Sequence, residues 1–134
     1  MTQPSYLVDT DWIIHYLNGH RKIVSKVKSL KKDGLSISII SLAELYEGVY
    51  YSTASVDNER ALSDFLSEVS IVEINEEVCK IFGKERGRLR REGKTISDFD
   101  LLIAATCLLW GLTLLTNNRR HFETIKQLKL ISPL

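Results

Sequence analysis

Short apolar segments alternate with longer stretches of helical periodicity, and this alternation constrains the fold more than any other feature of the chain. The strand-like segments are residues 5–10, 35–40, 71–74, 112–116 and 128–131. The clearest helical stretches are residues 41–52, 57–69, 75–92 and 98–110. Parallel strands need long crossover connections, which helices supply. The sequence therefore predicts an α/β fold in which helices cover both faces of a parallel sheet.

The length of the chain indicates one structural unit. Its 134 residues are typical of one compact domain, and we expect a single domain over residues 1–134. No secretory leader is evident, and the apolar run at 101–110 is too short to cross a bilayer, so we expect a cytoplasmic protein with no membrane partner. Cys79 and Cys107 lack metal-ligand spacing, and both are interpreted as core thiols in a reducing compartment.

Basic residues are unevenly distributed although the net charge is only +1. Between Lys80 and Lys94 there are seven basic residues against Glu85 and Glu92, and a second basic cluster covers 21–32. Such a cluster alone indicates a solvated helix face. Beside an acidic site it has a second interpretation, as a surface that holds a polyanion.

Polar residues occur where the predicted strands end. Asp9 closes the first strand, and Glu44 lies about one helical turn after the second. Asp100 begins the helix that leads to the fourth strand, and Asn118 follows that strand. Ligands of open parallel sheets bind beyond the carboxyl ends of the strands. We therefore expect these four residues at one edge of the sheet.

Two of these acids have an alternative interpretation as helix caps. The segments "SLAE" and "SDFD" match the capping box, in which a serine caps the helix and an acid three residues later bonds the amide of the cap. Ser41 and Ser97 would then be the caps, with Glu44 and Asp100 reaching back. Asp9 has no such role, because no turn requires an acid at the end of a parallel strand.

The three acids also match the preferences of a divalent cation. Mg²⁺ and Mn²⁺ prefer oxygen ligands, and such an ion lowers the pKa of a bound water and stabilises charge on a phosphate. The segment "LVDTD" admits another interpretation, a dehalogenase-type phosphatase with Asp9 as nucleophile and Asp11 as acid. That family needs an acidic pair after a later strand, and the "RREGKT" that precedes "SDFD" has no strand pattern, so this interpretation is less favoured.

Four segments in order resemble PIN-domain proteins of the VapC toxin type. They are "YLVDTDWII", "SIISLAELYEGV", "SDFDLLIAATCLLWGLTLLTNNRRHF" and "QLKL", and together they span almost the whole chain. The resemblance implies a three-layer α/β/α PIN-like fold around a central, mainly parallel sheet of four to five strands. It also implies an endoribonuclease that depends on Mg²⁺ or Mn²⁺, forms a homodimer and is held inactive by a cognate VapB-type antitoxin.

The resemblance also assigns roles to individual residues. It places the catalytic acids and expected metal ligands at Asp9, Glu44 and Asp100. The fourth catalytic position falls on Asn118, where many PIN domains have aspartate and VapC-like members often have asparagine. The residues expected to support these four are Thr10, Asp98 and Thr116.

The surface of such a nuclease must hold RNA despite its acidic site. Cations have to hold the phosphates that flank the cleaved bond. The basic residues that lead up to the acids are the candidates for this contact, namely Arg86, Arg88, Arg90, Arg91 and Lys94. A catalytically weak PIN-like binding module, whose acids persist mainly as caps, is the alternative function.

Aromatic and leucine side chains at 41–69 are candidates for an interface. Tyr50 and Tyr51 lie near a predicted helix end and are expected to be exposed. With the leucines of this region, they would supply apolar surface for a homodimer or for the antitoxin.

Overall fold

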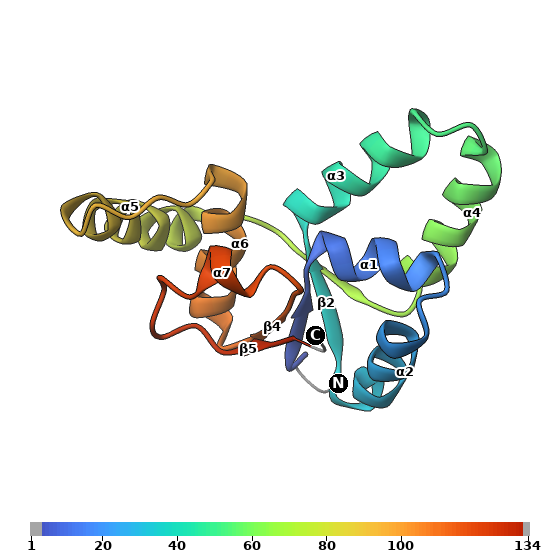
Figure 1. The fold of residues 1–134 in the computed structure, drawn as a ribbon, viewed down its shortest axis with the longest axis horizontal. Helices are drawn as coiled ribbons and strands as arrows, with labels where there is room; N and C mark the ends of the chain where they lie inside the picture. Colours follow the sequence, from blue (N-terminus) through green and yellow to red (C-terminus); the bar gives the residue numbers. More distant parts are fainter. Residues whose placement is uncertain (1–3, 133–134) are drawn as a thin grey trace.

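The computed structural model describes residues 4–132, and its centre is one five-stranded sheet (Figure 1). Its strands are β1 (Tyr6–Val8), β2 (Leu35–Ser38), β3 (Ser70–Val72), β4 (Thr113–Leu115) and β5 (Leu130–Ile131). Their order is β3-β2-β1-β4-β5, and every pairing is parallel. The predicted parallel sheet is confirmed. The strands are shorter than predicted because helices begin almost directly after them.

Helices fill the connections between the strands. They are α1 (Thr10–Leu17), α2 (Arg21–Leu30), α3 (Ile39–Tyr50), α4 (Ser55–Leu66), α5 (Glu76–Arg91), α6 (Asp98–Trp110) and α7 (Arg119–Phe122), with a 3₁₀ turn at Lys31–Asp33. The basic cluster at 21–32 largely coincides with α2, which buries Ile23 and Val27 and exposes its lysines. This cluster is therefore a solvated helix face.

The central strands β1 and β4 divide their side chains between two cores. Leu7 and Leu114 pack with residues of α5, α6 and α7, whereas Val8 and Leu115 pack with residues of α1 to α4. This alternation follows from the period of two along a strand. Figure 1 shows the result, with the two groups of helices on opposite sides of the sheet. The three-layer α/β/α architecture is confirmed.

Helix α6 is largely buried and carries Asp98 and Asp100 in its first turn. Ser97 caps its start, and Gly111, in the left-handed region at φ 66°, ends it, so its bounds agree with the prediction. Cys107 is buried on this helix, as predicted, but the prediction for Cys79 was wrong. Cys79 is exposed because Asn75 caps α5 in a register that directs Val78, and not Cys79, into the core. Among residues 4–132 no helix combines the length and apolar character needed to cross a membrane.

The strand order reverses at β1, which lies between β2 and β4. Chain connections leave β1 and β4 toward opposite faces, and in sheets of this kind ligands bind at the carboxyl ends of the two strands. This region is called the crevice. The Asp9 amide donates to the Leu115 carbonyl (2.9 Å) and joins the two strand ends. The crevice is therefore the position where the topology favours a ligand.

Candidate active site

Asp9 lies at the centre of the crevice and is only 5% exposed. It caps α1, and its Oδ1 accepts a hydrogen bond from the Thr10 amide (2.9 Å). Its Oδ2 accepts a hydrogen bond from the Thr116 hydroxyl (2.7 Å), which comes from the end of β4. Both carboxylate oxygens are therefore held in place by neighbouring elements, as the predicted supporting roles of Thr10 and Thr116 require.

The environment of Asp9 disfavours its negative charge. Burial raises the pKa of the Asp9 carboxyl from 3.8 to about 7, and the charges of Asp11 and Asp100 add to this rise. The hydrogen bonds from Thr116 and Thr10 oppose it without cancelling it. An ionised Asp9 thus lies among like charges in a buried position, where a cation would be stabilising.

Glu44 is joined to Asp9 through Thr10. The Thr10 hydroxyl donates to Glu44 Oε1 (2.8 Å) and lies 2.9 Å from the Ser41 hydroxyl. The capping interpretation is wrong for this segment, because α3 begins earlier than predicted. Ser38 is its cap and accepts from the Ser41 amide (3.1 Å). The Glu44 carboxylate is thereby available to the crevice.

Asp100 lies in the first turn of α6. Half of the capping interpretation is confirmed here, because Ser97 is the cap and accepts from the Asp100 amide (3.2 Å). The Asp100 carboxylate, however, contacts His121 Nδ1 (3.0 Å). Asp98 differs in kind, because its side chain is 78% exposed and pairs with Arg86 (2.7 Å). Only Asp100 of this pair is half-buried beside the crevice.

The loop after β4 brings Asn118 to the same edge. The backbone N–H of Asn118 donates to the Thr116 hydroxyl (3.0 Å), which itself donates to Asp9. Asp11 accepts from the Asn117 amide (3.1 Å), and burial raises the pKa of its carboxyl. The Trp12 indole donates to Asn117 Oδ1 (3.1 Å). The contacts of Asp11 and Trp12 with Asn117 are together called the clasp. The clasp fixes the loop that presents Thr116 and Asn118.

The four predicted catalytic residues converge at one edge of the sheet. Asp9 is connected to Glu44 through Thr10 and to Asn118 through Thr116, and the charge of Asp100 is close enough to affect Asp9. Within residues 4–132, no three His, Cys, Asp or Glu side chains already have the arrangement of a metal site. The carboxylates of Glu44 and Asp100 instead face Thr10 and His121.

The donor set nevertheless fits a hard cation. It consists of carboxylate oxygens that repel one another, and Mg²⁺ or Mn²⁺ selects such ligands while retaining several waters. The raised pKa of Asp9 favours a cation here, because burial, together with the charges of Asp11 and Asp100, destabilises the ionised carboxylate and a bound cation would stabilise it.

Two arginines of the predicted RNA-binding cluster have partners within the chain. Arg86 donates to the Ile96 carbonyl (2.9 Å) as well as to Asp98. Arg88 pairs with Glu85 and Glu92 and donates to the Thr124 carbonyl (3.0 Å). These contacts hold α5 against its neighbours.

The other members of the cluster are more accessible. Lys94 pairs with Glu92 (3.1 Å). Arg90 and Arg91 are exposed. Contact of the cluster with RNA stays a prediction.

The sequence did not predict three of these contacts: Asp11 with Asn117, Ser41 with Thr10, and His121 with Asp100. Each contact joins segments that are far apart in the sequence, so periodicity gives no signal for it. The "HF" pair was part of the family resemblance, and it was the only sequence signal that involved His121.

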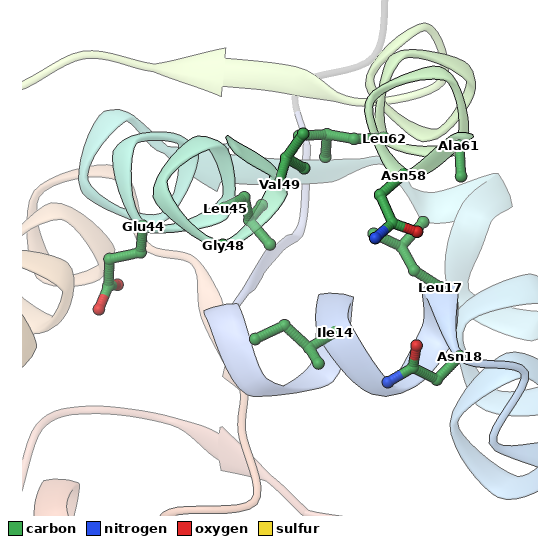
Figure 2. Close-up of a pocket in the computed structure, with 10 residues that line it drawn as sticks. All are labelled: Ile14, Leu17, Asn18, Glu44, Leu45, Gly48, Val49, Asn58, Ala61 and Leu62. Atoms are coloured by element: carbon green, nitrogen blue, oxygen red, sulfur yellow. The ribbon is translucent and has the colours of Figure 1, made fainter. Parts of the chain in front are cut away.

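An apolar groove of about 220 Å³ adjoins the acids (Figure 2). It lies between α1, α3 and α4, with Glu44 at one end and Ile14, Leu45 and Leu62 among its lining residues. Ile14 is 46% exposed. The groove therefore offers a site for apolar side chains directly beside the Glu44 carboxylate.

Exposed aromatic residues lie at the far end of α3. Tyr50 and Tyr51 are 60% and 88% exposed, as predicted. The leucines expected to be exposed with them are not: Leu45 and Leu62 are buried, and Leu42 and Leu66 are half-buried. They pack into the core between α3, α4 and the sheet, where their helical spacing directs them.

Comparisons with known proteins agree with this geometry. The PIN domain family matches residues 6–128. Ribonuclease VapC1 of Haemophilus influenzae is 32% identical over 92% of this chain and 94% of its own length. Ribonuclease VapC2 of Rickettsia felis is 33% identical over 93% of this chain and 95% of its own length. A crystal structure of VapBC2 from Rickettsia felis bound to a DNA fragment is similar with a TM-score of 0.88 and 32% identity, covering 95% of this chain and 97% of that chain.

Proposed function

The chain belongs to the PIN-domain family and, within it, to the VapC-type proteins, and from this membership we propose that it is an endoribonuclease acting as the toxin of a toxin–antitoxin pair. The observation that carries the proposal is that Asp9 is linked to Glu44 through Thr10 and is affected by the charge of Asp100 at the same edge of the sheet. RNA is the proposed substrate, as the names of the relatives support. A nuclease of this kind acts in the cytoplasm.

We further propose that Asp9, Glu44 and Asp100 hold Mg²⁺ or Mn²⁺. When bound, the ion supplies a reactive water at neutral pH and stabilises charge on the phosphate. Thr116 and Thr10 orient the Asp9 carboxylate, and Thr10 also holds Glu44. Asn118 provides an amide at the same edge without adding another negative charge.

His121 has a comparable role at Asp100, where its Nδ1 contacts the carboxylate. The residues that orient the acids therefore come from several elements, which fixes the site before substrate arrives.

The alternatives make different predictions for a cleavage assay. An active nuclease cleaves end-labelled RNA with Mg²⁺ or Mn²⁺, stops when a chelator is added, and leaves a small phosphate monoester intact. A catalytically weak PIN-like binding module binds RNA without cleaving it. Monoester hydrolysis that depends on Asp9 would support the phosphatase interpretation, which family membership disfavours. Absence of RNA cleavage by the folded protein under all metal conditions would contradict the proposed activity.

We propose a VapB-type antitoxin as the protein partner, because solved relatives are VapBC complexes. The groove beside Glu44 is the proposed binding site of an apolar antitoxin segment, since a segment bound there would lie against the proposed catalytic carboxylate of Glu44. Ile14→Asp introduces a charge at its exposed wall and should weaken antitoxin binding without loss of RNA cleavage. Unchanged antitoxin affinity would contradict this placement.

We also propose a homodimer. The exposed Tyr50 and Tyr51 supply apolar surface for it.

A further inference from the structure

Two hollows adjoin the acidic edge, and both are lined by Arg120 and His121. The first, of about 540 Å³, extends from these residues to Asp100 and to the Thr95 and Ser97 side of the loop before α6. The second, of about 410 Å³, is lined by the same two residues and by Asn117, Asn118, Arg119, Glu123 and Ser132, so it contains one carboxylate beside two arginines. Together they form a track that passes Asp100 and Asn118.

The cation in this track is held by a rigid support. Arg120 lies on α7, whose Phe122 is fully buried in the core beneath it. The His121 amide donates to the Asn118 carbonyl (3.0 Å), and its ring contacts Asp100. Arg120 itself is exposed. Its backbone is therefore fixed beside the acidic edge, and its exposed side chain lines both hollows.

The acidic edge repels a phosphodiester unless cations stand beside it. The guanidinium groups of Arg86 and Arg88 are already hydrogen-bonded to carboxylates and carbonyls within the chain. Arg120 has no such carboxylate or carbonyl partner among the described residues 4–132. An arginine in this position provides a planar set of donors that matches the oxygens of a phosphate.

We propose that this track is a subsite for the RNA backbone and that Arg120 binds the phosphate next to the cleaved bond. The inference rests on the proposed ribonuclease function and adds to it the residue that positions the substrate. Thr95 and Ser97 also line the first hollow, and a hydroxyl group can donate to phosphate or ribose oxygens. Apart from the His121 imidazole, no aromatic ring is among the described residues that line the two hollows. Contacts in the track thus position the strand and contribute little to base choice.

The test measures binding of a fluorescein-labelled single-stranded RNA of mixed sequence to the full chain in chelator, where the strand stays intact. Arg120→Ala should weaken binding roughly tenfold, the value of one charge-assisted contact. It should also lower the slope of log affinity against log salt by about 0.7, because one fewer counterion is released. Arg120→Lys keeps the charge and should retain most of the salt slope.

Arg60→Ala is the matched control, because Arg60 is exposed on α4 and its loss changes the net charge equally. The control should keep the wild-type affinity and slope. Wild-type values for Arg120→Ala, or equal losses in both variants, would overturn the proposal. If the wild type cleaves RNA but Arg120→Ala binds normally, only this subsite fails. If the wild type neither binds nor cleaves RNA, the proposed function fails as well.

Discussion

Asp9→Asn separates the cost of burying a carboxylate from its use as a ligand. The side chain keeps its size, but the ionisable carboxyl group, whose pKa is raised to about 7 mainly by burial, is removed. A folded-state pKa above the ordinary 3.8 means that the folded protein holds a proton that the unfolded chain has released between these values. The free energy of unfolding of the metal-free wild type therefore falls as pH rises through this window.

The size of this effect follows from the two pKa values of Asp9. A rise from 3.8 to about 7 corresponds to at most about 4 kcal/mol of lost stability once the group is ionised. Between about pH 5 and about pH 8 the loss amounts to about 2.5 kcal/mol, because the unfolded chain is already ionised at the lower value. Asp9→Asn lacks this contribution. The variant should therefore gain about 2.5 kcal/mol relative to the wild type across that interval.

Urea unfolding in chelator at the two pH values measures this difference. Addition of Mn²⁺ at the higher pH should stabilise the wild type by about 2.7 kcal/mol when the ion is at 100 times its dissociation constant. The variant should gain much less. A stability difference between the two proteins that does not change with pH would refute the burial argument. Equal Mn²⁺ stabilisation of both would refute the ligand role of Asp9.

Four further substitutions test the metal site and the proposed dimer. Asp100→Asn should lower metal-dependent RNA cleavage by about 100-fold or more with the fold intact, because loss of a metal ligand costs at least as much as loss of a supporting residue. Asp98→Asn should stay active. The reverse pattern would assign the ligand role to Asp98. His121→Ala should weaken Mn²⁺ binding about tenfold by calorimetry, because the contact that holds Asp100 is lost, and unchanged affinity would leave that contact without a role. Tyr51→Asp should shift a homodimer toward monomer in sedimentation, and a wild type that is already monomeric at micromolar concentration would contradict the dimer.

Local signals in the sequence account for what was predicted well. The bounds of α6 followed from a serine cap and a glycine that ends the helix in the left-handed region. Asp9 was placed correctly because a residue that directly follows a buried parallel strand must lie at the carboxyl edge of the sheet. The start of α3 was predicted late, since Ile39 and Ile40 continue the strand pattern although Ser38 already caps the helix.

Contacts between distant segments account for what was missed. The sequence shows Arg86 and Arg88 as a basic run, whereas their partners are decided by how α5 packs against the segments around Ile96 and Thr124. The contact of His121 with Asp100 likewise depends on α7 folding back over the start of α6. Periodicity reports which face of an element is buried, but it does not report which side chains meet there.

A crystal structure with Mn²⁺, with the ion located by its anomalous scattering, tests the central claim most directly. The account predicts a peak at the carboxyl ends of β1 and β4, ligated by Asp9 and Asp100, with the Glu44 carboxylate turned from Thr10 toward the ion. A crevice without a peak at a Mn²⁺ concentration that supports RNA cleavage, or a peak bound only by residues outside it, would contradict the claim that these acids form the metal site of a nuclease.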